Sequence, residues 1–224
     1  MKRIIVAAVV AALSLAASPA LADMTAQLGT YHSVIHGLGG GYFDVTRTGT
    51  IPEWDAAGVT SNFRTFCVEN VYFTPGVNYY ATIDDTVQQG GPAPLLQLTK
   101  TLYAHYYYNS GPMGWQTIDG NWDMNAGFQA LIWDIQGVFG GSYHGVAYNW
   151  LTQAQQGWYD TYYNYAVANA QGNEGMVRVL NLWLNPDHSG DVQSQLCMTV
   201  PAPAAVLLGV IGLGLVGWVK RRLA

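Results

Sequence analysis

Near its C-terminal end the chain carries an apolar, glycine-studded run from Ala204 to Val219, followed directly by Lys220-Arg221-Arg222. A helix rises roughly 1.5 Å per residue, so this run is about long enough to cross a ~30 Å hydrocarbon core. A basic cluster after such a span stays on the cytoplasmic side. Pro201 and Pro203 prevent the preceding chain from continuing as a helix into the run. The sequence therefore predicts that residues 200–224 form a tail outside the folded body, in which the apolar span is a transmembrane helix between the proline motif and the basic end.

The order of the tail segments resembles that of an exported protein family. Val200-Pro201-Ala202-Pro203, the apolar span and the basic end together resemble the PEP-CTERM family of Gram-negative proteins, in its Val-Pro-x-Pro variant. The usual Pro-Glu-Pro of the family is Pro201-Ala202-Pro203 here. The resemblance implies a sorting tail that is recognised by processing machinery in the inner membrane. The alternative is an ordinary C-terminal anchor, and both interpretations place the rest of the chain outside the cytoplasm.

The N-terminal end has the three parts of a secretory signal peptide. Met1-Lys2-Arg3 is a basic start, Ile4 to Ala17 is apolar, and Ala20-Leu21-Ala22 is a small-residue cleavage site. We therefore expect residues 1–22 to be removed and residues 23–199 to form one exported domain, at the cell surface or in the extracellular matrix. Its membrane attachment through the tail would be transient or lasting.

The charge of this expected domain excludes one class of partner. All 14 acidic residues of the chain lie within it, against four basic residues, which gives a net charge near −10. Nucleic-acid binding depends on clustered Lys and Arg, so no nucleic-acid partner is expected.

The pattern of apolar residues and turn signals predicts an α+β fold. Strand-like segments come first, helical spacing occupies the middle, and strand-like segments return at the end. Asn125 is expected to cap the second helix, and Gly137 to end it. We expect a sheet or sandwich made by the N- and C-terminal strands, with a helical insertion between them. The expected strands are 31–35, 41–46, 63–72, 77–83, 177–184 and 192–200, and the expected helices are 94–108, 125–137 and 152–171.

Two segments concentrate the chemistry. Phe66-Cys67-Val68-Glu69 places a cysteine between bulky apolar residues on an expected strand. Phe128-Gln129-Ala130-Leu131-Ile132-Trp133 places a glutamine near the start of an apolar helix, on the face shared with Trp133. A buried glutamine is costly unless its amide is hydrogen-bonded or chemically used.

Together these segments resemble the Cys-Gln thioester domains of bacterial surface proteins. That family carries an aromatic-Cys-apolar motif, here Phe66-Cys67-Val68, and later an apolar-Gln-x-x-apolar-Trp motif, here residues 128–133. Where the family usually has Thr before the glutamine, this chain has Phe128. The resemblance implies an internal thioester between the Cys67 and Gln129 side chains, in a fold that covers most of residues 23–199.

The expected chemistry can be stated from the residues alone. A Cys67 thiolate held against the Gln129 carboxamide attacks its carbonyl carbon and expels ammonia, because proximity can lower the barrier by ~7–11 kcal/mol. Phe66, Phe128 and Trp133 would exclude water and slow hydrolysis. An amine on a surface or matrix partner would then displace Cys67, which makes the protein a single-use covalent anchor and not a turnover enzyme. No cofactor is expected.

The strongest alternative at Cys67 is a disulfide with Cys197, since an even cysteine count in an oxidising compartment ordinarily means pairing. Free buried thiols are a third possibility. A hydrolase triad of Cys67 with His105 or His144 and Asp134 is a weaker alternative, and Gln129 itself has the plain alternative of a helix amide bonded to a strand. The five histidines lack paired zinc-ligand spacing, so no metal site is expected, and 187–191 is a solvated turn or a loose calcium site.

A second class of function is suggested by the aromatic residues. Faces of Tyr and Trp beside Asn, Gln and Asp are what a sugar ring requires, so a non-catalytic exopolysaccharide-matrix protein is the alternative function. The residues concerned are Tyr106, Tyr107, Tyr108, Asn109, Trp115, Trp122 and 158–165.

Overall fold

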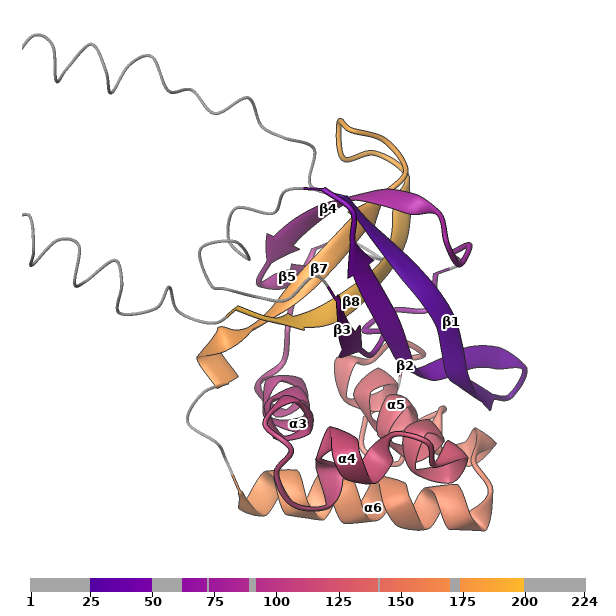
Figure 1. Ribbon diagram of the computed structural model, residues 1–224. Helices are drawn as coiled ribbons and strands as arrows, with labels where there is room; N and C mark the ends of the chain where they lie inside the picture. Colours follow the sequence, from indigo (N-terminus) through magenta and orange to yellow (C-terminus); the bar gives the residue numbers. More distant parts are fainter. Residues whose placement is uncertain are drawn as a thin grey trace, which may run out of the picture.

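The computed structural model describes residues 25–49, 62–71, 73–88, 92–140, 142–169 and 174–199 (Figure 1). The expected signal peptide and the expected tail helix lie outside these residues. Within the described part of the chain, no helix has the length and apolar character needed to cross a membrane.

The strands form one antiparallel six-stranded sheet, and the expectation of an α+β fold is confirmed. The strand order is β3-β2-β1-β4-β7-β8, so strands from both ends of the chain share the sheet (Figure 1). A separate two-stranded sheet pairs β5 with β6. The strands are β1 Thr25–Ile35, β2 Leu38–Arg47, β3 Asn62–Thr65, β4 Asn78–Asp84, β5 Thr86–Val87, β6 Ala93–Pro94, β7 Val177–Trp183 and β8 Asp191–Met198.

The two edge strands of the sheet meet each other. Directly after β3, the Val68 amide donates to the Ser194 carbonyl at 3.1 Å, and the Leu196 amide donates to the Phe66 carbonyl at 3.0 Å. Cys67 therefore faces Gln195 of β8 in an antiparallel bridge. The first and last parts of the described chain thus close the sheet on itself at residues 66–68.

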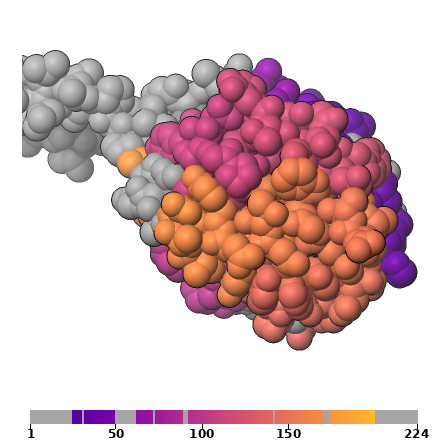
Figure 2. Space-filling model, turned by 90° about the horizontal axis from the view of Figure 1, so that it is seen from below, coloured from indigo at the N-terminus to yellow at the C-terminus, as the bar shows by residue number. Residues whose placement is uncertain are grey.

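The helices lie together below the sheet in Figure 1. Seen from below, the helical middle of the chain forms most of the surface, and the first strands show only at its margin (Figure 2). The helices are α3 Gln97–Tyr107, α4 Trp115–Ile118, α5 Trp122–Gln136 and α6 Gln153–Ala168, with short 3-10 turns at Gly111–Met113, Tyr148–Trp150 and Glu174–Met176.

The helix ends show where the sequence expectation was right and where it was wrong. Gly137 ends α5 in the left-handed conformation, at φ 73°, as expected. The N-cap of α5, however, is Asn121, whose side chain accepts from the Met124 amide, and Asn125 lies one turn inside the helix. The expectation failed because both asparagines satisfy the same cap preference. Thr152 and Gln155 form a capping box at the start of α6.

The buried residues divide into two cores. The inner core is enclosed by strands and contains Ala26, Leu28, Val45, Tyr79, Ala81, Leu180, Leu182, Val192 and Cys197. The helix-side core lies between the sheet and the helices, and Phe66, Cys67, Phe128 and Trp133 belong to it. The two cysteines therefore lie in different cores.

Candidate functional site

Cys67 occupies the point where the chain leaves β3 and runs beside β8. Its neighbours Phe66 and Val68 use their backbone groups to bond β8. Successive residues of a strand direct their backbone groups to opposite sides, so the N–H and C=O of Cys67 point away from β8. β2 pairs with β3 only as far as Phe43 and Thr65, and among the strands that the structure describes none pairs with the Cys67 backbone on that side.

Gln129 of α5 supplies the missing partner. Its Oε1 accepts from the Cys67 amide at 3.0 Å, and its Nε2 donates to the Cys67 carbonyl at 2.8 Å. Both residues are fully buried. The carboxamide of Gln129 thus hydrogen-bonds the backbone of Cys67 in the way that an adjacent strand would, although the two residues are 62 positions apart in the sequence. The structure therefore places Cys67 and Gln129, the two residues expected to react, in contact. The hydrogen bonds between them are also those of the alternative interpretation, in which Gln129 is a helix amide bonded to a strand.

The β2 strand leaves room for this contact at a glycine. A Cβ on Gly40 would lie 3.4 Å from Cγ of Gln129 and 3.2 Å from Cδ1 of Ile35. The absence of a side chain at Gly40 therefore lets the Gln129 side chain pass beside β2 to reach Cys67.

The Cys67 thiol is surrounded by side-chain amides of β8. Gln195 Nε2 lies 3.6 Å from the Cys67 Sγ. Burial raises the pKa of the Cys67 thiol, and the nearby Glu69 carboxylate raises it further, while hydrogen bonds from Gln195 and Gln193 lower it. A thiolate is the nucleophilic form, so the two amides favour the reactive state and burial opposes it.

Gln193 and Gln195 were missed at the sequence level. They lie two positions apart on β8, within the stretch where its pairing with β7 is irregular, and both are buried. Each has an Oε1 without a hydrogen-bond partner among the described residues. The sequence signal that could identify them is the polar run Gln193-Ser194-Gln195 between Val192 and Leu196, because burying polar side chains costs free energy unless they are hydrogen-bonded.

The expected shielding residues enclose the site. Phe66 and Phe128 pack with ring centroids 4.6 Å apart, and Tyr106 meets Phe66 edge-on at 4.9 Å. Trp133 is fully buried, and its Nε1 donates to the Glu69 carbonyl at 3.2 Å. The aromatic residues therefore separate the Cys67–Gln129 contact from solvent on the helix side.

The disulfide considered between Cys67 and Cys197 is not formed, because both cysteines are free and buried. Cys67 lies opposite Gln195, whereas Cys197 lies opposite Arg178 of β7. Cys197 is thus only a diagonal neighbour of Cys67, and diagonal pairs are about 7–8 Å apart, beyond the usual Cα separation of a disulfide.

The residues of the hydrolase triad are not brought together. His105 contacts the Asn169 carbonyl, and His144 lies 2.6 Å from Asp160. Asp134 accepts from the Ala147 and Tyr148 amides at 2.9 Å each, which fixes the loop before α6. In the described ranges, no three His, Cys, Asp or Glu side chains are grouped so as to hold a metal ion. In the 187–191 turn, Asp187 accepts from the Ser189 hydroxyl and amide.

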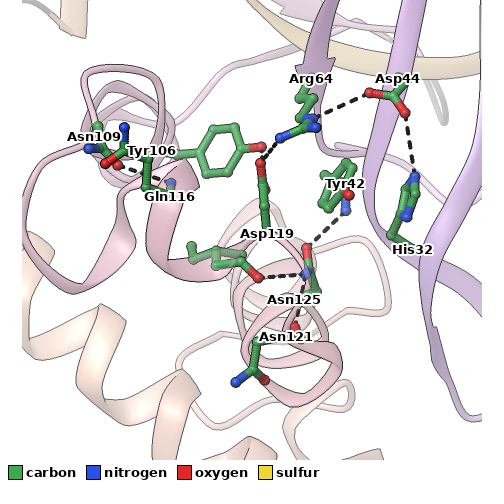
Figure 3. Close-up of polar contacts among 11 residues, drawn as sticks. His32, Tyr42, Asp44, Arg64, Tyr106, Asn109, Gln116, Asp119, Asn121 and Asn125 are labelled. Carbon is green, nitrogen blue, oxygen red and sulfur yellow. Dashed lines mark hydrogen bonds and ion pairs between the residues drawn. The ribbon is translucent and has the colours of Figure 1, made fainter.

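A second polar cluster joins the sheet to the start of α5 (Figure 3). Arg64 forms ion pairs with Asp119 and, at 3.4 Å, with Asp44, while Tyr106 donates to Asp119 at 3.0 Å. Burial raises the pKa of Asp119, against the hydrogen bond from Tyr106 and the charge of Arg64. Asn125 accepts from the Tyr42 amide at 3.3 Å and donates to two carbonyls, so its buried side chain is fully used.

Beside this cluster lies a cavity of about 230 Å³, lined by His32, Gly120, Trp122 and Asn125. The Trp122 side chain is 52% exposed. His32 stacks on Tyr42 with ring centroids 4.0 Å apart. The cavity therefore combines an accessible aromatic side chain with polar groups. It lies at the start of α5, whereas Gln129 lies further along the same helix.

Comparison with known proteins does not place the chain in a family. No protein-family model matches it, and no curated protein or solved structure is significantly similar to it.

Proposed function

We propose that the protein is an exported surface protein that forms an internal thioester between Cys67 and Gln129 and uses it for covalent attachment to an amine on a partner. The observation that carries the proposal is the double hydrogen bond between the Gln129 carboxamide and the Cys67 backbone. It holds the amide carbon beside the residue that bears the thiol. The sorting of the protein to the surface rests on the resemblance of its two ends to targeting segments.

The hydrogen bonds suit the chemistry of thioester formation. The Cys67 sulfur attacks the Gln129 side-chain carbonyl carbon, the carbon–nitrogen bond breaks, and the thiol proton leaves with the nitrogen as ammonia. Negative charge develops on Gln129 Oε1 during the attack, and the Cys67 amide already donates to that oxygen at 3.0 Å. A donor positioned where charge develops stabilises the transition state.

The second half of the proposal is the reaction of the thioester with an amine. An incoming primary amine attacks the thioester carbon, a new carbon–nitrogen bond forms, and Cys67 leaves as a thiol that takes the proton from the amine. The product is an amide link between Gln129 and the partner. Attachment consumes the thioester, so each thioester attaches one partner.

Intact mass of the denatured, non-reduced protein tests the proposal. Thioester formation removes ammonia, so the expected mass is ~17 Da below that of the processed sequence. Cys67→Ala and Gln129→Ala should each abolish this deficit and any amine adduct, and Cys197→Ala should retain both. An adduct on Gln129→Ala, or a wild-type protein of full mass, would contradict the proposal.

A second candidate function is non-catalytic binding of an exopolysaccharide. The cavity beside Trp122 favours it, because an exposed indole with the His32 imidazole nearby is suited to a sugar ring. Titration with neutral oligosaccharides, followed by tryptophan fluorescence, should give saturable binding that Trp122→Ala removes. Trp115→Ala, at another exposed indole, is the control and should leave binding intact.

A further inference from the structure

A cluster of polar aromatic side chains joins α6, which lies below the other helices in Figure 1, to the loop that precedes it. Asp160 of α6 accepts from the Tyr143 hydroxyl at 3.0 Å, and the same oxygen, Oδ1, lies 2.6 Å from Nε2 of His144. None of these three residues takes part in the proposed thioester. The His144 side chain is 44% exposed and that of Asp160 is 36% exposed, so the cluster is accessible from solvent.

The loop that carries two of these side chains is fixed from the protein interior. The His144 ring stacks on Tyr143 and on Tyr148, with ring centroids 4.0 and 4.1 Å apart. The His144 backbone is in the left-handed region, at φ 56°, which is uncommon for a residue other than glycine. Its amide donates to the Tyr159 hydroxyl, which in turn donates to the buried carboxylate of Asp134. The cluster is therefore held in one arrangement, as a binding site requires.

The polar atoms of the cluster are spaced like the ligands of a metal ion. Neighbouring ligands of an octahedral ion bound at ~2.0–2.1 Å lie about 2.8–3.0 Å apart. Asp160 Oδ1 lies at similar distances from Tyr143 Oη and His144 Nε2. Because a carboxylate only accepts hydrogen bonds, each of the two contacts holds one proton. A cation that replaces these protons meets a phenolate, an imidazole and a carboxylate.

The donor set and its pKa favour one kind of ion. Phenolate and carboxylate oxygens are hard anionic ligands, and imidazole is a common ligand of iron. Zinc sites are built from Cys, His and carboxylates, and calcium takes oxygen ligands, so neither ion suits this combination. Partial burial and the Asp160 carboxylate raise the pKa of Tyr143 to about 12. A highly charged cation is therefore needed to remove the phenol proton at neutral pH.

We propose that Tyr143 Oη, His144 Nε2 and Asp160 Oδ1 form a binding site for ferric iron, with the remaining positions taken by water or a small chelating anion. The Tyr143 O–H bond breaks, an iron–oxygen bond forms, and one proton is released for each ion bound. His144 remains neutral, because its Nε2 proton is exchanged through solvent for one on Nδ1. Histidine spacing in the sequence could not indicate this site, since the other ligands are a tyrosine and an aspartate 16 positions away.

Titration of the full secreted chain with ferric nitrilotriacetate, followed by visible absorption, tests the proposal. A phenolate bound to ferric iron gives a charge-transfer band that neither the free protein nor ferric nitrilotriacetate shows, and saturation at one ion per chain is expected. Tyr143→Phe keeps the ring and should lose the band. Asp160→Asn and His144→Asn should each weaken binding by at least about tenfold. Asn replaces His144 because it tolerates the left-handed backbone.

Matched controls are available for both kinds of side chain. His188, like His144, is exposed and left-handed, at φ 59°, and it follows Asp187 and lies 5.7 Å from the ring of Trp183. His188→Asn should therefore bind iron as the wild type does. Tyr108→Phe removes the hydroxyl of an exposed tyrosine outside the cluster and should keep the band.

A wild-type protein without the band, or a band that survives in Tyr143→Phe, overturns the ferric site. Equal losses in His188→Asn and His144→Asn would show adventitious histidine binding and overturn it as well. If Tyr143→Phe does not fold, wild-type affinity in Asp160→Asn has the same consequence. Zinc sulfate is the comparison ion, and zinc binding as tight as that of iron would show a plain His–Asp site without a phenolate.

The iron site and the thioester can fail separately. Cys67→Ala lacks the sulfur of the thioester and should still develop the band, because Cys67 is not a ligand. Loss of the band in Cys67→Ala would place the iron at the thiol and overturn the assignment to Tyr143.

Discussion

Cys67 and Cys197 are both fully buried thiols close to β8, yet their surroundings differ in kind. Cys197 lies in the inner core, where burial raises its pKa and the charge of Arg178 lowers it. Cys67 lies on the helix side, contacted by the amides of Gln129, Gln193 and Gln195. The two thiols therefore share their burial but differ in their contacts, because side-chain amides lie only against Cys67 among the contacts described for the two.

Counting thiols in the denatured, non-reduced protein gives the sharpest contrast between the two cysteines. If Cys67 is held in a thioester, a thiol-reactive dye should label one cysteine, and treatment with methylamine should raise the count to two. In Cys197→Ala, the number of labelled thiols should be zero before methylamine treatment and one after it. Two reactive thiols in untreated wild-type protein would break the distinction, and none before or after methylamine would indicate a disulfide.

The energetic side of the comparison is tested by Gln129→Leu against Cys197→Ala. Gln129→Leu leaves the Cys67 N–H and C=O buried and unpaired, at ~1–3 kcal/mol each, so its unfolding free energy should lie about 2–6 kcal/mol below that of Cys67→Ala, which forms no thioester and keeps both hydrogen bonds. Cys197→Ala removes one buried sulfur and should cost on the order of 1 kcal/mol.

Urea denaturation at pH 7 measures both changes. Cys67→Ala, which keeps the backbone contacts to Gln129, separates loss of the hydrogen bonds from loss of a cross-link. Equal stability of Gln129→Leu and Cys67→Ala would mean that the backbone contacts contribute nothing beyond the cross-link.

The pH dependence of stability should also distinguish the two thiols. A thiol whose pKa is raised by folding adds stability below its unfolded pKa of ~8.5, and this stability is lost as pH rises toward the folded value. One such free thiol lowers the unfolding free energy by up to ~1.4 kcal/mol per pH unit above that point.

Removing Cys197 should therefore flatten the decline of stability between pH 8 and 9.5, whereas Cys67→Ala should leave the slope unchanged, because a thioester sulfur carries no proton. Short denaturation assays over this range measure the slopes. A steeper slope after methylamine treatment is expected, and an equal flattening by both variants would show that Cys67 is a free thiol.

The smallest expected effect comes from Gly40→Ala. Its Cβ would press on the Ile35 and Gln129 side chains, so a loss on the order of 1 kcal/mol is expected, together with slower appearance of the mass deficit. Gly157→Ala is the control, because the exposed helical Gly157 has open space around it and the change should stabilise α6 by ~0.8–1 kcal/mol. Unchanged thioester formation in Gly40→Ala would show that the passage beside β2 does not govern the contact.

The sequence was sufficient for the longer strands and helices because the apolar periodicity and the turn residues agree locally. The strand expected at 63–72 was wrong beyond Thr65, where β3 ends, and the short elements β5, β6 and α4 were not predicted. The strand and helix order, the Gly137 stop and the Thr152 start of α6 follow from such signals. The closure of the sheet at residues 66–68 did not follow, because pairing between residues more than a hundred positions apart leaves no local trace. Gln193 and Gln195 were overlooked for the same reason: their role exists only once β8 lies beside Cys67.

The Cys67–Gln129 contact could be anticipated from the two motifs, but its form could not. Sequence spacing indicated a glutamine on the helix face shared with Trp133. It did not indicate that the amide would bond the Cys67 backbone in place of a strand, which depends on β2 ending its pairing with β3 at Phe43. The form of the contact between Gln129 and Cys67 therefore depends on the register of the sheet, which the sequence did not indicate.

The pairing of residues 66–68 with β8 also sets an order of events during synthesis. A ribosome releases the chain from its N-terminal end, so Cys67 and Gln129 emerge well before residues 191–198. Until that final strand arrives, one side of Cys67 has no neighbour and the amides of Gln193 and Gln195 are absent from it. The completed surroundings of the sulfur are thus withheld until translation of the domain is almost finished, and a prematurely terminated chain lacks them.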